Sequence, residues 1–401
     1  MPDNDDNSKP PPSRTTRPPS SDESPAPSTL LRRTTQRLAA VGPASMRGSP
    51  PSRSAGHAAL RRSSPLLKLS PEDFDLVNAA RRILEGSLSL VPGETALVIV
   101  DRARQSLVAP LAEVAKLSGA KCEVVVLEDV GMRPIRELPP SVEESLAQAQ
   151  ATVLLVGFVE GEHTMRLQLL ERVRDLGLRH AHMVGVTRRT MLAGFSVDPT
   201  RILDATRAVR MRLRPGSVLH ARTTAGTDLR VKLNPTHRWA EHVGVIRPGR
   251  WENLPSGELM TAPEQVDGMF VCDASAGGPF GAAAGLLTRT PIRLEIEGGV
   301  VKTVSCNDSS VQRGMESFIA LDRGSGQVGT IVLGTNVGLL APIGELVCDQ
   351  NLPGLHLSLG SSFPEVTGAP ATTSAQLSLT SSGGDVDLDG APLIRAGRYM
   401  V

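Results

Sequence analysis

The sequence predicts two folded domains, an α/β domain with a mostly parallel sheet followed by a β-rich (α+β) domain. Up to about residue 217, short uninterrupted apolar runs alternate with helical patterns, and beyond it short alternating segments are joined by glycine turns. A chain of 401 residues is also too long for one compact core. We therefore divide it into a tail at 1–65, an α/β domain at 66–217 and a β-rich domain at 218–401.

The tail, residues 1–65, contains Pro, Ser and Arg in place of any apolar periodicity. Such a composition cannot bury enough surface to offset the entropy of the chain, so we expect disorder. Two interpretations stay open: a solvated tail, or a docking or regulatory segment.

The α/β domain is expected to begin with a helix in SPEDFDLVNAARRILEGSL, with Ser70 as N-cap and Pro71 at the first helical position. The run from Ala96 to Val100 is typical of a strand that is buried on both faces of a parallel sheet. Three further strands are predicted in KCEVVVLED, ATVLLVGFVE and HAHMVGVT. Neither GxGxxG nor GxxxxGK[ST] follows the first strand, so no nucleotide-binding loop is predicted.

The β-rich domain is predicted from alternating segments such as SVLHARTTAGTDLRVKL, PIRLEIEGGVVKTVSC and DVDLDGAPLIRAGRYMV. The tripeptides EGG and LDG indicate hairpin turns, and only MESFIALDRG looks helical. This pattern favours a barrel-like or sandwich domain.

Composition argues against several classes of partner. Lys and Arg number 43 against 42 acids, and aromatic residues are 2% of the chain, so neither nucleic acid nor an acidic membrane surface is an expected partner. No apolar run approaches the roughly 20 residues that span a bilayer, and no signal-peptide pattern opens the sequence. Four widely spaced cysteines read as reduced thiols, so we expect a cytoplasmic protein without a disulfide or zinc framework.

Two residues stand out as candidates for chemistry. Glu258 lies in NLPSGELMTAP, where a stiff Pro/Gly backbone suits a metal bridge or a general base, or an acid that only anchors the turn. His356 lies in LPGLHLSLGSSF and is either a metal ligand or a hydrogen-bonded histidine in the core.

Four other histidines are weaker candidates for a functional site. His180 and His182 share one face at strand spacing, and we expect them at a surface or a domain interface. His237 and His242 precede Glu258 in an expected loop, where they are either exposed or line the same cleft.

The order of these motifs resembles the M29 family of metalloaminopeptidases, the aminopeptidase T type, and more distantly the dihydroxypyridine ring-opening dioxygenases. The resemblance covers residues 66–401 and is carried by VPGETALVIVD, NLPSGELMTAP, VGTIVLGTN and LPGLHLSLGSSFPEVTG. It implies an α/β domain, a β-rich domain that carries the active-site cleft, and a homodimer that encloses it.

The resemblance further implies a site for two metal ions built from carboxylates and histidines. Glu258 and His356 match two ligand positions, but neutral residues occupy the others. Thr330 replaces a glutamate, Gln376 and Ser378 replace a His-x-Asp pair, Phe363 replaces a tyrosine, and Gln350 stands where a glutamate is common. Neutral oxygens are weak ligands, and a catalytic zinc normally keeps three protein ligands.

Three functional readings follow. The leading one is a pseudoenzyme without metal or cofactor, leaning away from catalysis, that binds a peptide or amino-acid-like ligand; one role would be an accessory factor in a peptide-modifying pathway. The second is an active leucyl-type aminopeptidase using zinc, cobalt or another divalent metal, with ligands recruited from Glu345, Asp349, Asp385 and Asp387. The third is a metal-independent enzyme with Glu258 and His356 as acid and base. The expected cleft in the leading reading consists of Glu258, Thr330, His356, Phe363, Gln376 and Ser378.

Overall fold

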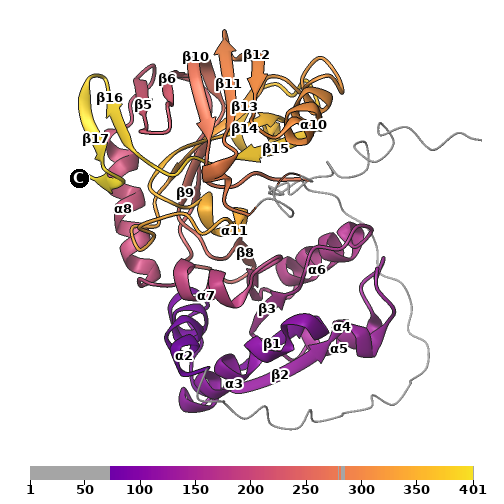
Figure 1. Cartoon of the computed structure of the whole chain (residues 1–401). Helices are drawn as coiled ribbons and strands as arrows, with labels where there is room; N and C mark the ends of the chain where they lie inside the picture. The colour runs from indigo at the N-terminus through magenta and orange to yellow at the C-terminus, as the bar shows by residue number, and fades with distance from the viewer. Residues whose placement is uncertain (1–72, 279, 281–284, 401) are drawn as a thin grey trace, which may run out of the picture.

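The computed structural model describes residues 73–278, 280 and 285–400 (Figure 1). The expected tail at 1–65 and the expected helix start at Ser70 and Pro71 lie outside these residues. The structure has an α/β part, drawn mostly in indigo to magenta, and a β-rich part, drawn in rose through orange to yellow. No helix in the described part of the chain has both the length and the apolar character needed to cross a bilayer.

The α/β part is built on a five-stranded sheet, sheet A, in the order β2-β1-β3-β4-β8, and every strand pair in it is parallel. This confirms the prediction of a parallel sheet. The strands are β1 (Thr95–Val100), β2 (Lys121–Val126), β3 (Ala151–Leu155), β4 (Arg179–His182) and β8 (Arg250–Asn253).

Helices cover both faces of sheet A, which explains why its central strands are apolar without alternation. Along β1, Val98 packs into one buried cluster and Leu97 into a second one on the opposite face. The first cluster includes residues of α2 (Phe74–Arg81), η2 (Arg82–Ser87) and α3 (Val108–Leu117), and the second includes residues of α5 (Pro140–Leu146) and α6 (His163–Asp175). The remaining elements of this part are η3 (Arg102–Leu107), α4 (Leu127–Val130) and α7 (Arg188–Gly194). The next helix, α8 (Pro199–Arg212), contributes Val209 to the core of the β-rich part.

The β-rich part consists of two sheets that share one core, which corresponds to the sandwich alternative. Sheet B has the order β12-β11-β10-β6-β5-β16-β17-β18, and sheet C has the order β15-β14-β13-β9-β7. Both sheets contribute leucines to a single buried cluster, for example Leu294 from sheet B and Leu357 from sheet C. The predicted hairpins are present between β11 and β12 and between β16 and β17, and the predicted helix is α10 (Ser309–Ile319).

The strands of sheet B are β5 (Val218–Arg222), β6 (Asp228–Leu233), β10 (Pro263–Cys272), β11 (Ile292–Glu297), β12 (Val300–Ser305), β16 (Asp385–Leu388), β17 (Ala391–Arg395) and β18 (Arg398–Tyr399). Those of sheet C are β7 (Ala240–His242), β9 (Glu258–Thr261), β13 (Val328–Gly334), β14 (Gly354–Gly360) and β15 (Gln376–Leu379). Short helical pieces are η4 (Leu287–Arg289), α11 (Leu346–Asp349) and α12 (Pro364–Thr367).

A division at residue 218 does not describe the chain path fully, because β8 lies beyond that point and still belongs to sheet A. The chain runs from β7 in sheet C to β8 in sheet A, where Trp251 pairs with His180, and then back to β9 in sheet C. The Glu252 carboxylate tethers this excursion by accepting hydrogen bonds from the backbone N–H groups of Val243 (3.0 Å) and Gly244 (2.7 Å). The segment from β7 to β9 therefore links the two parts, with β7 and β9 in sheet C and β8 in sheet A.

Candidate functional site

One face of sheet C collects most of the residues that the sequence singled out. Residues paired directly across antiparallel strands point to the same side of a sheet. The register pairs Thr330 with Ser358, Ser358 with Ser378, Val332 with His356, Gly334 with Glu258, Glu258 with His242, and Gly360 with Gln376. We call these side chains the polar face of sheet C: His242, Glu258, Thr330, His356, Ser358, Gln376 and Ser378. The intervening leucines of β14 point into the core instead.

Phe363 packs onto the middle of this face. It follows β14 with a left-handed backbone (φ 51°), and its ring clusters with Met260 and Val332. The guanidinium of Arg238 donates hydrogen bonds to the carbonyls of Val366 (2.9 Å) and Glu365 (3.0 Å), which holds this cover in place. The polar face is thus divided by an apolar strip into a Glu258 end and a Thr330 end.

Glu258 forms the charged end of the polar face. Its side chain is 14% exposed, and His242 Nε2 lies 3.9 Å from its Oε1. Among the residues that the structure describes, no side chain or backbone N–H donates a hydrogen bond to this carboxylate. Burial raises the pKa of Glu258 above its ordinary value, and the nearby His242 opposes that rise in pKa. His242, expected in a loop, is instead a β7 residue paired with Glu258.

The backbone before Glu258 is fixed by two buried asparagines that the sequence reading did not assign. Asn336 Nδ2 donates to the carbonyls of Ser256 and Gly194, both at 3.0 Å, and Asn351 Nδ2 donates to that of Pro255 at 3.3 Å. Gly257 has φ 125°, and a Cβ there would lie 2.6 Å from the Asn336 nitrogen. The NLPSGE and LGTN motifs therefore contact each other in the folded protein. In the sequence, only the resemblance to the M29 family linked these two motifs.

His356 is buried with both ring nitrogens in hydrogen-bonding distance of the backbone. Nε2 lies 2.8 Å from the Leu352 carbonyl, and Nδ1 lies 3.2 Å from the backbone nitrogen of Ser381. These partners require a neutral ring that donates from Nε2 and accepts at Nδ1. Burial lowers the pKa of His356 to about 4, which is consistent with a neutral ring. In this arrangement the ring has no spare lone pair for a metal, so the geometry is that of a hydrogen-bonded core histidine.

The far end of the polar face is neutral. Ser358 Oγ and Ser378 Oγ lie 3.2 Å apart, and Gln376 Nε2 is 3.5 Å from Ser378 Oγ, at the limit of a hydrogen bond. The Thr330 side chain is fully buried, and within the described part of the chain its hydroxyl has no hydrogen-bond partner. A buried hydroxyl without a partner carries a cost of about 1–3 kcal/mol.

The described residues contain no group of three or more His, Cys, Asp or Glu side chains that could hold a metal ion. The acids considered as replacement ligands have other partners. Glu345 accepts hydrogen bonds from Thr187, Asp349 from backbone nitrogens such as Ile343, Asp385 from the backbone of Ala396, and Asp387 pairs with Arg222 and Arg395.

The expectation for His180 and His182 is wrong, because both are buried inside the α/β part. His180 Nδ1 lies 2.6 Å from Thr152 Oγ1, and His180 Nε2 lies 3.2 Å from His182 Nδ1. Burial lowers the pKa of His180 to about 3. Strand spacing placed them on one face as expected, but α6 covers that face. The alternation of a strand does not reveal what lies above it.

Comparisons with known proteins agree with this architecture. A family model described as NicX, 2,5-dihydroxypyridine 5,6-dioxygenase, matches residues 75–321. A solved 2,5-dihydroxypyridine dioxygenase from Pseudomonas putida KT2440 aligns with a TM-score of 0.55 at 18% identity, covering 81% of this chain and 97% of that one. Wild-type AmpT from Thermus thermophilus aligns with a TM-score of 0.54 at 20% identity, covering 82% of this chain and 99% of that one. No curated protein sequence gives a significant match.

These findings bear on the expectations in different ways. The likeness to AmpT confirms the aminopeptidase-like M29 fold, but at 20% identity it carries no aminopeptidase function. The matched family is named for an enzyme, so the match does not support the prediction that this protein is a pseudoenzyme. Because the family model spans more than half of the 401 residues, the chain belongs to the 2,5-dihydroxypyridine 5,6-dioxygenase (NicX) family and has the fold of the M29 aminopeptidases.

Proposed function

We propose that the polar face of sheet C binds the amino terminus of a short peptide without a metal ion. The observation that carries this proposal is that polar groups on this face lack hydrogen-bond partners among the described residues. The Glu258 carboxylate accepts no hydrogen bond from any described residue, and the Thr330 hydroxyl has no partner among them. A partly buried carboxylate without a partner is costly, so Glu258 is better satisfied by a ligand than left alone.

An ammonium group is the natural complement of Glu258. It supplies a positive charge and three N–H donors, and charge-assisted hydrogen bonds are about twice as strong as neutral ones. Among the described side chains, the one basic group within 4 Å of this carboxylate is the imidazole of His242, whose Nε2 lies 3.9 Å away, beyond hydrogen-bonding distance. The 14% exposure of the Glu258 side chain allows an external amine to approach it.

The surroundings of Glu258 indicate which part of a ligand binds there. Met260, Val332 and Phe363 form an apolar strip next to the Glu258 end of the face. The Thr330 end lies four residues along β13 from Gly334, the partner of Glu258, which is about 13 Å at 3.3 Å per residue. The Thr330 side chain there is fully buried, so a ligand reaches the Glu258 end of the face. The arrangement suits a peptide whose amino group meets Glu258 and whose first side chain is apolar.

A ring-opening dioxygenase is the second candidate, and the family match favours it. Non-haem iron oxygenases of the common type hold the metal with two histidines and one carboxylate, leaving open positions. The described residues do not fit that requirement, since they offer no group of three ligands and the backbone engages both nitrogens of His356. We therefore derive no reaction step through iron for this chain.

Calorimetry with tripeptides that carry an apolar first residue tests the proposal. We expect binding that is lost when the peptide amino group is acetylated and that weakens at least tenfold in Glu258→Gln, since a hydrogen bond to a charged group is worth about 1.5–3 kcal/mol. Glu264→Gln is the matched control, because Glu264 pairs with Lys232 on the surface of sheet B.

Two outcomes would contradict the proposal. One is equal affinity for free and acetylated peptides. The other is the absence of peptide binding together with oxygen-dependent consumption of 2,5-dihydroxypyridine by protein supplied with ferrous iron, which would establish the second candidate.

A further inference from the structure

A second charged region lies at the carboxyl edge of sheet A, outside the polar face of sheet C. The connections from β1 lead to β2 on one side and then to β3 on the other, so the strand order reverses between β1 and β3. In open α/β sheets, ligands bind in the crevice outside the carboxyl ends of the strands at such a point. Asp101 directly follows β1, and Gly157 lies two residues beyond β3.

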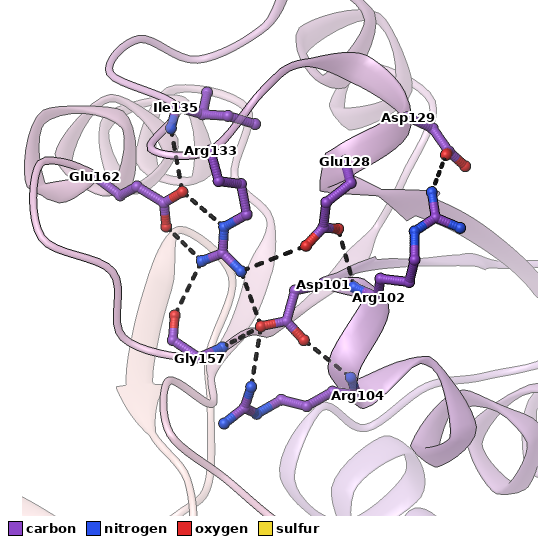
Figure 2. A network of polar contacts seen from close by, with 9 residues as sticks. All are labelled: Asp101, Arg102, Arg104, Glu128, Asp129, Arg133, Ile135, Gly157 and Glu162. Carbon is purple, nitrogen blue, oxygen red and sulfur yellow. Dashed lines mark hydrogen bonds and ion pairs between the residues drawn. The ribbon is translucent and has the colours of Figure 1, made fainter. Parts of the chain in front are cut away.

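In this protein the side chain of Arg133 lies in that crevice (Figure 2). Its Nε and Nη2 donate to the two oxygens of Glu162 at 2.8 and 2.6 Å, and Nη1 donates to Asp101 Oδ2 at 2.9 Å. Nη2 also donates to the Gly157 carbonyl at 3.0 Å. The two oxygens of Glu162, one oxygen of Asp101 and the Gly157 carbonyl together match the planar set of N–H donors of a guanidinium.

The two acids that bind Arg133 are buried, and contacts with the protein hold them in position. Asp101 is 2% exposed and Glu162 is 1% exposed. Asp101 is oriented by the backbone nitrogens of Gly157 (2.5 Å) and Arg104 (3.0 Å) and by Arg104 Nη1 (3.0 Å). A Cβ on Gly157 would lie 2.6 Å from Arg104 Nη1, so a larger residue there would displace the end of the Arg104 side chain that orients Asp101.

Arg133 reaches the crevice from a connecting segment, residues 131–139, which we call the Arg133 arm. Its Met132 is 92% exposed, whereas Ile135 is buried and its backbone nitrogen donates to Glu162 at 3.1 Å. The arm therefore has its own anchors beside the crevice, and the Arg133 side chain is the part that fills the crevice itself.

We propose that the crevice between β1 and β3 is a guanidinium-binding site that this chain occupies with its own Arg133. The site takes planar cations of the alkylguanidinium class, and the Arg133 arm closes it in cis. This differs from a purely structural ion-pair network in one measurable respect. Once the Arg133 side chain is removed, the crevice still offers the oriented oxygens of Asp101 and Glu162, and an external guanidinium can replace the missing group.

The test uses the full-length Arg133→Ala variant and thermal unfolding in low-millimolar methylguanidinium. We expect the variant to melt below the unmodified protein and to regain a saturable Tm shift of about 2–4 °C with methylguanidinium. Ethylammonium and sodium chloride at equal ionic strength should produce no comparable shift, because neither has the planar fork. The unmodified protein should not respond, because Arg133 already fills the site.

Arg102→Ala is the matched control, since Arg102 pairs with Asp129 on the surface, where their side chains are 59% and 62% exposed. It should show no guanidinium-dependent shift. The proposal is overturned if Arg133→Ala responds no more than the unmodified protein, or responds equally to ethylammonium. If Arg133→Ala does not fold, refolding yield with and without methylguanidinium decides instead: recovery specific to methylguanidinium supports the site, and no recovery rejects it.

Discussion

The crevice of sheet A holds two acidic side chains and the polar face of sheet C holds one, and the two regions differ in how these acids are paired. In the crevice, Asp101 and Glu162 are buried and every contact in Figure 2 joins a donor to an acceptor within the chain. On the polar face, Glu258 and Thr330 lack such partners among the described residues.

The difference separates a site that the chain fills with its own Arg133 side chain from one that is suited to an outside ligand. A fully paired buried network rigidifies the fold, whereas an unpaired polar group there carries a penalty that a ligand can relieve. Changes in the crevice should therefore act mainly on stability, and changes on the polar face mainly on binding.

The largest effect is expected from Asp101→Ala. This substitution leaves the guanidinium of Arg133 and the backbone nitrogen of Gly157 without their shared acceptor. Breaking a buried ion pair by removing one partner costs about 3–5 kcal/mol, which urea denaturation would measure. Asp129→Ala should cost less than about 1 kcal/mol, because its pair with Arg102 is exposed. Equal losses in the two variants would remove the distinction between the crevice and the surface.

Acid should weaken both parts of the molecule through buried histidines, His180 in the α/β part and His356 in the β-rich part. Burial lowers the pKa of His180 to about 3 and that of His356 to about 4, both below the unfolded value of about 6.5. Because the unfolded chain binds these protons more readily, stability is present above pH 6.5 and is lost as pH falls toward 4, by about 2 kcal/mol per histidine at pH 4.5. Urea midpoints between pH 7 and 4.5 would show this loss.

Two variants separate the contributions of the polar face to that pH profile. His356→Gln should flatten the fall in stability with acid. Glu258 has the opposite sign, because a raised folded pKa favours folding at low pH and this contribution is lost as pH rises above the ordinary value of 4.5. Glu258→Gln should therefore make the fall in stability with acid steeper. Parallel profiles for the two variants would contradict the assigned signs.

The smallest expected effect on stability is that of Thr330→Val. Valine has nearly the shape of threonine and removes the buried hydroxyl that lacks a partner, so the free protein should be unchanged or more stable by up to about 1 kcal/mol. A loss of stability of about 1 kcal/mol or more would mean that the hydroxyl is satisfied within the protein.

Local sequence patterns were sufficient to predict much of the fold. The apolar run at β1 predicted a doubly covered parallel strand, and the alternation in β11 predicted a half-buried strand, since its burial follows a period of two. The shared face of Glu258 and His356 was expected only from the resemblance; in the structure it follows from the register of β9, β13 and β14.

The sequence by itself determined the strands with a clear apolar pattern, such as β1 and β11, because apolar periodicity acts over a few residues, but it did not predict β7 or β8. Only the tertiary structure decided what surrounds each polar side chain. It placed His242 beside Glu258, returned β8 to sheet A, joined Asn336 to the segment before Glu258, and enclosed His356 between two backbone groups. Those partners lie far apart along the chain, and hydrogen bonds between distant residues leave no periodic trace in the sequence.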